Sequence, residues 1–306
     1  MQGLVTARSA ERVWLVFLIE NLDRLRSSVC TGIEQGVVQL PSSSHQTRVV
    51  GIDPGPAKGL HRFDANGWKH VALDGSRSYI QELTREESVL VCWDAPLTGP
   101  AVEGLLLNSN PRKKDFTQRP IDAFFGRKEW NFKAPKGISV LPYSGCSHWT
   151  ISRSLLGLPR VGPYDQEKDL PFQLCHGDSI PGSGVHIVEV HPALALWLWC
   201  KNDQRVENWE YKKDRKLCSQ LLNYLSDHIQ DDAAREAFTL AQGKIDHEKR
   251  GFDDIFDSCI AYVLGDLWIR DAGDVILLGD LDTGAMLLPN VDGLKEQWES
   301  FRGPND

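Results

Sequence analysis

The 306-residue sequence lacks the features of a membrane or disulfide-stapled secreted protein. Its most apolar stretch near the N-terminus, residues 13–19, is far shorter than the ~20 residues that a membrane-spanning helix needs. No basic segment, apolar core and small-residue cleavage site follow one another there, so no secretory signal is expected. The seven cysteines include no C-x-x-C pair. We therefore expect a cytoplasmic protein with buried, reduced thiols and no membrane partner.

An excess of positive charge and an internal repeat are also absent. The formal net charge of −8 argues against a uniformly basic surface for nucleic acid. Hydrophobic residues at 41% and charged residues at 25% exclude collagen-like, coiled-coil and fully disordered chains. The ten tryptophans need either a deep core or a binding surface.

Positive charge is concentrated in one segment. Residues 108–160 contain ten Lys or Arg and three Asp or Glu. Aromatic residues are mixed with them, and this combination can hold phosphates and stack on bases. A solvated insertion with aromatic anchors explains the pattern equally well. The aromatic residues are Phe116, Phe124, Phe125, Trp130 and Phe132. The candidates for binding nucleic acid are Arg112, Lys113, Lys114, Arg127 and Lys128.

The hydrophobic pattern predicts an α/β domain over residues 48–306, preceded by a helical extension and linker over residues 1–47. Residues 97–184, which are mostly irregular, are expected to form a large insertion. The strands are expected over residues 48–55, 59–64, 68–73, 88–96 and 185–191, with a two-stranded hairpin over residues 275–289. The helices are expected over residues 78–84, 193–200, 209–228, 231–242, 252–270 and 294–301, and the helix at 252–270 carries an amphipathic pattern.

Three predicted strands each carry one carboxylate. Asp53 and Asp94 end apolar strands, and Glu189 lies inside a third. Buried carboxylates need a cation, a proton or a hydrogen-bond network. A divalent metal would satisfy all three, and oxygen ligands without Cys or His favour Mg²⁺ over Zn²⁺. Two such ions could activate a water and stabilise the leaving oxygen of a phosphodiester.

The predicted helix over residues 252–270 begins with three further carboxylates, Asp253, Asp254 and Asp257. Helical periodicity places Asp257 beside the apolar stripe and Asp254 nearly opposite it, which favours Asp257 as the inward-facing residue. Carboxylates in a first turn also complement the helix dipole, and this is the commoner reason to find them there.

Six motifs follow one another in the chain: GIDPGPAKG, VCWDAP, RPID, SVLP, VEVHPALALW and DDIFDSCIAYV. Over roughly residues 48–290 this series resembles an uncharacterised family of predicted nucleases with the RNase H-like fold. The last motif is also similar to the D-x-x-D-A-x-A-x-A helix of RuvC-type resolvases, with Ser258 in place of the usual Ala.

This resemblance implies an α/β fold with an RNase H-like mixed sheet flanked by helices. It also implies hydrolysis of phosphodiester bonds in DNA or RNA with Mg²⁺ or Mn²⁺ as cofactor. The catalytic residues by this resemblance are Asp53, Asp94, Glu189 and Asp257. Asp254 would be an additional metal ligand.

Accessory roles are open for three residues. His191 could act as a general base or contact a phosphate, although a His before Pro192 is more often a turn residue with local hydrogen bonds. Arg119 and Asp122 resemble the R-x-x-D element of the same family, in which Arg could pair with a phosphate. A structural salt bridge fits the same spacing.

Two other functions are compatible with the sequence. The Asp53-Pro54-Gly55 turn resembles the first phosphate loop of actin-like and sugar-kinase ATPases, with residues 279–284 as a candidate second loop. The protein would then be an ATP-dependent phosphotransferase. The third function is a non-catalytic adaptor that binds nucleic acid. A nuclease should bind Mg²⁺ or Mn²⁺ in the absence of nucleotide, whereas a kinase should bind these ions mainly together with ATP. An adaptor should not bind them under either condition.

Overall fold

The computed structural model describes residues 47–98, 119–126, 128, 130–138, 140, 147–157, 171–177, 180–203, 206, 208–248, 250–271, 273–281 and 283–303. The expected helical extension lies outside this part of the chain except for Thr47. Residues 99–118 and 158–170 of the expected insertion also lie outside it.

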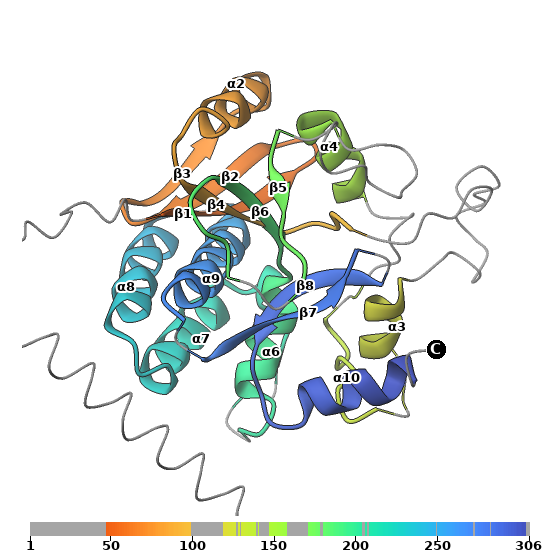
Figure 1. Cartoon of the computed structure of the whole chain (residues 1–306). Coiled ribbons are helices and arrows are strands. Elements are labelled where there is room, and N and C mark those ends of the chain that lie inside the picture. Colours follow the sequence, from red (N-terminus) through yellow and green to blue (C-terminus); the bar gives the residue numbers. More distant parts are fainter. Residues whose placement is uncertain are drawn as a thin grey trace, which may run out of the picture. The chain divides into compact units, whose positions relative to one another are not determined.

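A six-stranded mixed sheet forms the centre of the described chain (Figure 1), in the order β3-β2-β1-β4-β6-β5. Strand β2 is antiparallel to β1 and β3, whereas β1, β4, β6 and β5 run parallel to one another. The carboxyl ends of the parallel strands therefore meet at one edge, which is where open α/β sheets bind ligands. The strands are β1 (Arg48–Gly55), β2 (Gly59–Asp64), β3 (Gly67–Val71), β4 (Val89–Trp93), β5 (Gln173–Leu174) and β6 (Val185–Glu189).

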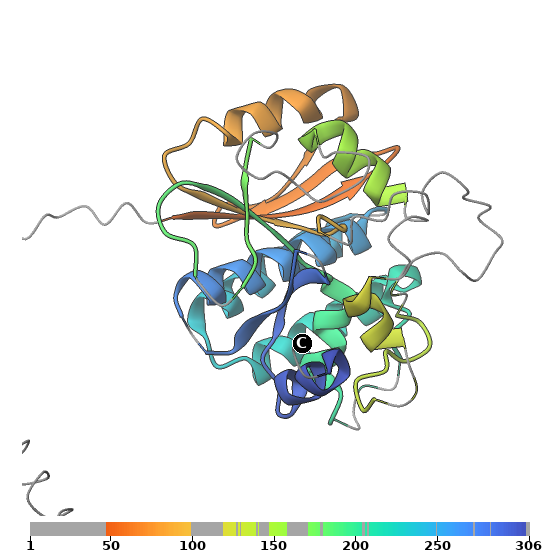
Figure 2. The ribbon, with the colours of Figure 1, turned by 45° about the vertical axis from the view of Figure 1, so that its right-hand side comes forward.

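Helices cover both faces of this sheet (Figure 2), so the fold is an α/β fold with a mixed sheet flanked by helices. One face carries α2 (Leu73–Leu83) and α4 (Ser147–Leu156), and the other carries α6 (Pro192–Cys200), α7 (Arg215–His228), α8 (Asp232–His247) and α9 (Phe252–Ile269). The remaining elements are α3 (Pro120–Gly126), η2 (Tyr211–Lys213), α10 (Leu294–Arg302) and a hairpin of β7 (Val275–Asp280) and β8 (Gly284–Pro289).

Strand alternation divides the core into two layers. Val50 and Ile52 of β1 pack with the α2 side, whereas Val49 packs with the α9 side. Leu90 and Cys92 of β4 also belong to the α9 layer. Successive side chains of a strand point to opposite faces, so alternate residues of each strand belong to opposite core layers.

Most of the predicted elements are confirmed, and the differences have local causes. The strand expected over residues 68–73 ends at Val71 because α2 begins at Leu73, earlier than expected. The helix expected over residues 209–228 consists of η2 followed by α7. Asp214 separates the two by capping α7, since its Oδ1 accepts hydrogen bonds from the backbone N–H groups of Lys216 and Leu217 at 2.9 and 3.2 Å.

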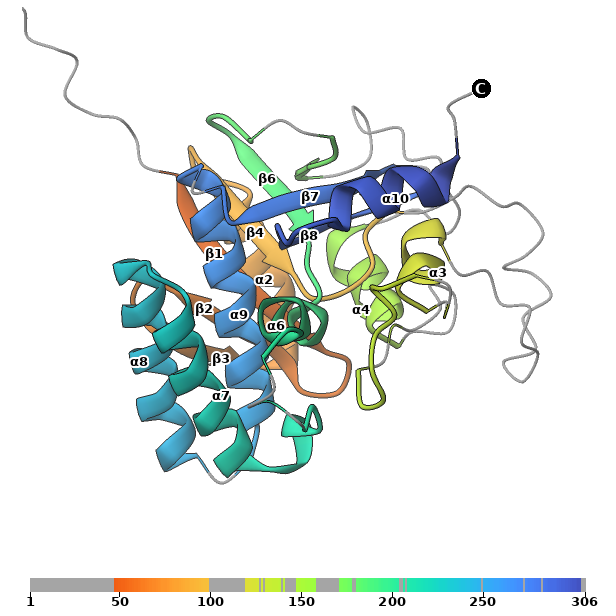
Figure 3. The same ribbon diagram turned by 90° about the horizontal axis from the view of Figure 1, so that it is seen from below.

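The helix predicted over residues 252–270 is confirmed as α9 (Phe252–Ile269), but it is buried on nearly all sides instead of being amphipathic. Helix α9 buries 14 of its 18 residues. It packs against the sheet on one side and against α6, α7 and α8 on the other (Figure 3), so nearly all of its circumference is covered. A helix that is apolar on all sides belongs in a core rather than on a surface.

Two glycines allow α9 to lie directly on the sheet. A Cβ atom at Gly51 of β1 would lie 2.2 Å from the carbonyl oxygen of Ser258 and 2.3 Å from the backbone nitrogen of Tyr262. A Cβ atom at Gly265 of α9 would lie 2.2 Å from Sγ of Cys92. The close contact therefore depends on the absence of side chains at both positions.

The five cysteines in the described part of the chain are unbridged, and four of them are buried. Cys175 is half-buried, and burial raises the pKa of its thiol to about 12. Among the described helices, none has the length and apolar character needed to cross a membrane.

Substitution of Gly51 by Ala should destabilise the fold by roughly 1–3 kcal/mol or more, because the new methyl group would meet backbone atoms that cannot move aside. Gly243→Ala in α8 is the matched control, since nothing lies within 4 Å of its added Cβ. It should stabilise the protein by roughly 0.5–1 kcal/mol. Urea unfolding of both variants measures the difference, and an unaltered midpoint for Gly51→Ala would contradict the close contact.

Candidate functional site

Asp53 and Asp94 lie side by side at the carboxyl edge of the parallel strands. The register pairs Ile52 of β1 with Trp93 of β4, and the backbone N–H of Asp94 donates to the carbonyl oxygen of Ile52 at 2.9 Å. Asp53 shares the face of Gly51 and so points toward α9. Asp53 is only 6% exposed and Asp94 is half-buried. No hydrogen bond from another described residue reaches either side-chain carboxylate.

Helix α9 adds Asp257 to this face. Asp257 is 1% exposed, and both of its oxygens are bonded. Oδ1 accepts a hydrogen bond from the hydroxyl group of Tyr211, and Oδ2 accepts one from Nζ of Lys212 at 2.7 Å. Both donors belong to η2, which precedes α7.

Asp254 is buried as well, so the prediction that it faces away from the core is wrong. The turn between β1 and β2 covers it. Nζ of Lys58 lies 2.9 and 2.8 Å from its two oxygens, and Nε2 of His61 lies 3.4 Å from Oδ2. Burial lowers the pKa of His61 to about 4, so Lys58 rather than His61 neutralises Asp254 at neutral pH.

Burial and like charges act together on Asp53 and Asp94. Burial raises the pKa of Asp53 well above its usual value, and the charges of Asp94 and Asp257 raise it further. The pKa of Asp94 is raised in the same way by burial and by Asp257. Lys212 opposes both shifts, and its own pKa is raised mainly by Asp257, with contributions from Asp94 and Asp53. Its ammonium group therefore acts on three carboxylates, although the side chain is 54% exposed.

The chemistry of these donors fits a divalent ion, because the Asp53 and Asp94 carboxylates accept no hydrogen bond from another described residue and offer the oxygen ligands that Mg²⁺ and Mn²⁺ prefer. Their present spacing does not form a closed metal site. In the described residues no three His, Cys, Asp or Glu side chains are close enough together to hold an ion. An ion would therefore have to draw side chains toward it.

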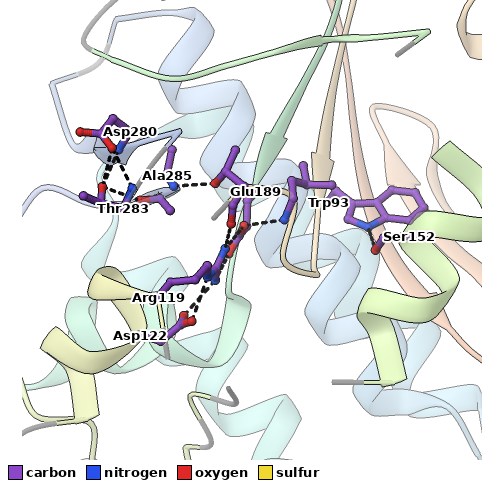
Figure 4. A network of polar contacts seen from close by, with 11 residues as sticks. Trp93, Arg119, Asp122, Ser152, Glu189, Asp280, Thr283 and Ala285 are labelled. Atoms are coloured by element: carbon purple, nitrogen blue, oxygen red, sulfur yellow. Dashed lines mark hydrogen bonds and ion pairs between the residues drawn. The ribbon is translucent and has the colours of Figure 1, made fainter. Parts of the chain in front are cut away.

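Glu189 belongs to a different environment from Asp53 and Asp94. It has the same alternation along β6 as Ile187, which packs in the core layer of α2. Its carboxylate accepts hydrogen bonds from Nη1 and Nη2 of Arg119, both at 2.6 Å, and from the backbone N–H of Leu97 at 2.7 Å (Figure 4). Burial raises the pKa of Glu189, and the guanidinium group of Arg119 opposes that rise.

Arg119 is 1% exposed and is the centre of a polar network (Figure 4). It forms the salt bridge with Asp122 that the R-x-x-D spacing allows, through bonds of 2.8 and 2.9 Å. It also donates to the carbonyl oxygen of Thr98 at 2.8 Å, and the hydroxyl group of Thr98 accepts a bond from the backbone N–H of Ala285 at 2.7 Å. This network joins segments of the chain that are nearly two hundred residues apart.

A cavity of about 220 Å³ lies between Asp94 and Glu189, and both carboxylates line it. Its polar lining residues are Asp94, Arg119, Asp122, Glu189, His191 and Lys212. His191 also caps α6, because its Nδ1 accepts a bond from the backbone N–H of Leu194 at 3.4 Å. The turn role that the sequence allowed for His191 is therefore present in the structure, beside its place in the cavity wall.

The nucleic-acid-binding candidates fall mainly outside the described residues. Arg112, Lys113, Lys114 and Arg127 lie outside this part, and Lys128 is exposed. Three of the aromatic residues, Phe124, Phe125 and Phe132, are at most 1% exposed in the core and are not available for stacking on bases. They anchor their segment, as the alternative interpretation of this region proposed.

Three residues that bind the carboxylates were not among the predicted site residues: Lys58, Tyr211 and Lys212. Lys58 follows Asp53 closely and lies in a Gly-rich turn, so its position beside a strand end was a usable signal. Lys212 stands in the run YKKD and has no pattern that separates it from Lys213. Its role depends on a tertiary contact with α9.

Comparisons with known proteins give one match. A family model described as a protein of unknown function (DUF429) matches residues 173–282, from β5 to β7. The matched segment includes Glu189, Lys212 and Asp257 but neither Asp53 nor Asp94. No curated protein matches the chain. No solved structure matches it either.

Replacing Asp53 by Asn should stabilise the metal-free protein at neutral pH. The pKa of the Asp53 carboxyl group is 3.8 in the unfolded chain and is raised on folding. The free energy of unfolding therefore falls as the pH increases from 3.8 through the raised pKa of the folded state. The amide removes this loss, so the advantage of the variant should vanish below about pH 4. Urea unfolding in EDTA across this pH range measures it, with exposed Asp227→Asn as control. Lower stability of Asp53→Asn at pH 7 would contradict the repulsion.

Replacing Glu189 by Gln should have the opposite effect. The change leaves Arg119 buried without one of its carboxylates, and breaking a buried ion pair costs about 3–5 kcal/mol. The same unfolding measurements distinguish the two sites, since one substitution should raise the free energy of unfolding and the other should lower it. A cost for Glu189→Gln below about 1 kcal/mol would show that the network does not stabilise the fold.

Proposed function

We propose that this protein is a metal-dependent phosphodiesterase that acts on nucleic acid and holds its metal ion on Asp53 and Asp94. The observation that carries the proposal is the adjacency of these two carboxylates, one buried and one half-buried, which have no hydrogen-bond partner among the described residues. Such groups need either a cation or a proton. Asp257, Asp254 and Glu189 already have cationic partners within hydrogen-bond distance, whereas Asp53 and Asp94 do not.

The sheet order supports the RNase H-like part of the proposal. Three antiparallel strands, β3-β2-β1, continue into parallel strands, and α9 lies across the face on which Asp53 and Asp94 point. Asp53 lies on the first strand and Asp94 directly follows the fourth, which are the positions that the sequence resemblance assigns to metal ligands.

In the proposed reaction, the oxygen of a water molecule bonds to phosphorus, the bond from phosphorus to one ester oxygen breaks, and the released alkoxide takes a proton. A bound Mg²⁺ or Mn²⁺ supplies the Lewis acid that activates the water and neutralises charge on the phosphate. Asp53 and Asp94 would hold that ion. Lys212 lines the cavity beside Asp94 and offers positive charge to a phosphate there.

The other carboxylates of the expected set have different roles in this arrangement. Asp257 positions Lys212 and Tyr211 through one oxygen each. Glu189 holds Arg119 and so fixes the wall of the cavity. Either residue would have to release a bonded partner before it could bind a metal ion.

The two alternative functions have less support. In the turn proposed as a second phosphate loop, the backbone N–H of Thr283 bonds Oδ1 of Asp280 at 2.8 Å, and the N–H of Asp280 bonds Oγ1 of Thr283 at 3.0 Å. Each of these amides therefore donates to the side chain of the other residue and is not available to a phosphate. A non-catalytic adaptor has no use for shielded carboxylates that repel one another.

Cleavage of labelled single- and double-stranded DNA and RNA tests the activity. We expect hydrolysis with Mg²⁺ or Mn²⁺ and none in EDTA. Asp94→Asn should lower the rate roughly a hundredfold or more, because a bound ion contributes several kcal/mol to the transition state. The exposed Asp227→Asn in α7 should retain the rate. Equal cleavage by the Asp94 variant, or in EDTA, would contradict the proposed function.

Binding of nucleic acid by the basic segment is tested separately by its dependence on salt. Changing Arg112, Lys113 and Lys114 together to Glu should weaken binding of a single-stranded oligonucleotide and reduce the slope of log K against log salt by about 2. Fluorescence anisotropy measures both quantities. The exposed residues Lys69, Lys216 and Lys244, changed together to Glu, alter net charge equally and serve as control. Equal effects of the two triple variants would assign the binding to net charge alone.

A further inference from the structure

The buried carboxylates of the site differ in how many oxygens are still available. Asp257 uses one oxygen for Tyr211 and the other for Lys212, and Asp254 uses both for Lys58. Asp53 and Asp94, which point to the α9 face of this edge, accept no hydrogen bond from another described residue on either oxygen. The oxygens available for a metal ion therefore belong to two adjacent residues.

We propose that Lys212 takes the place of one of the two metal ions expected for such a nuclease, so that the site binds a single divalent ion on Asp53 and Asp94. This inference rests on the proposed function and specifies its cofactor stoichiometry. It concerns the position and charge of Lys212 rather than its titration.

The local structure holds Lys212 on Asp257, one of the carboxylates that the sequence resemblance assigns to the metal ions. Its neighbour Tyr211 is 1% exposed, and the Tyr211 ring lies 4.6 Å from that of Phe256, centroid to centroid. This anchor fixes the backbone of η2 against α9, and Nζ of Lys212 reaches Asp257 at 2.7 Å. The next residue, Lys213, is 76% exposed and pairs only at 3.4 Å with Glu210. Two consecutive lysines thus have different environments.

Charge balance favours one ion. When Asp53, Asp94 and Asp257 are ionised they carry three negative charges, and Lys212 cancels one of them. The remaining two charges equal those of a single Mg²⁺ or Mn²⁺. A second divalent ion would leave an excess of two positive charges in the cluster before substrate binds, at the cost of its repulsion from Lys212. Lys58 pairs with Asp254 and also offsets part of the charge of the half-buried Asp253.

Titration with Mn²⁺ in the absence of nucleic acid tests the inference by counting ions. Calorimetry, with electron paramagnetic resonance of the free Mn²⁺, should give one site in the parent protein and none in Asp53→Asn. Lys212→Met removes the charge and keeps an unbranched side chain that is one atom shorter. It should bind a second ion, or bind the first at least tenfold more tightly. Lys213→Met is the matched control and should resemble the parent, and Lys212→Arg should retain one site.

The outcomes separate this inference from the proposed function. Two Mn²⁺ sites in the parent, or one site of equal affinity in the parent and Lys212→Met, would overturn the role of Lys212 and leave the nuclease proposal standing. No Mn²⁺ binding by either protein would overturn both. Thermal unfolding in EDTA establishes that each variant is folded. If Lys212→Met does not fold, Lys212→Gln replaces it, with the same expected gain in Mn²⁺ binding.

Discussion

Negative charges gathered on one buried face are the constraint on which the proposed chemistry depends. The contact of α9 with β1, made possible by Gly51 and Gly265, brings Asp257 to the face where Asp53 and Asp94 point. Burial removes the water that would otherwise screen these charges. The structure compensates them partly with Lys212 and leaves the rest unbalanced, which is unfavourable for folding and favourable for binding a cation.

The carboxylates at this edge of the sheet divide into two kinds by their partners. Glu189 forms an ion pair with Arg119 through two short hydrogen bonds, and this pair connects the chain near Thr98 to the hairpin near Ala285. Its charge is satisfied, so its contribution is to stability and to the shape of the cavity. Asp53 and Asp94 stabilise nothing that the described structure shows. A buried polar group that destabilises the fold and stabilises no other part of the structure is a candidate for a functional role.

The extent to which the sequence predicted this arrangement follows from the range of the interactions. Strands β1 and β2 and the β7–β8 hairpin were predictable because alternation and turn residues are local signals. Asp53 and Asp94 were predictable because each follows an apolar strand. The burial of Asp254 was not, since it depends on Lys58 from a turn that is distant in sequence. The pairing of Glu189 with Arg119 was likewise not predictable, because the two residues lie seventy positions apart in the sequence.

The most direct test of the account is a crystal structure with Mn²⁺, in which anomalous scattering locates the ion independently of activity. We predict one ion held by the carboxylates of Asp53 and Asp94, with Lys212 still bonded to Asp257. An ion bound instead by Glu189 after release of Arg119, or no ion at these carboxylates at millimolar Mn²⁺, would contradict it.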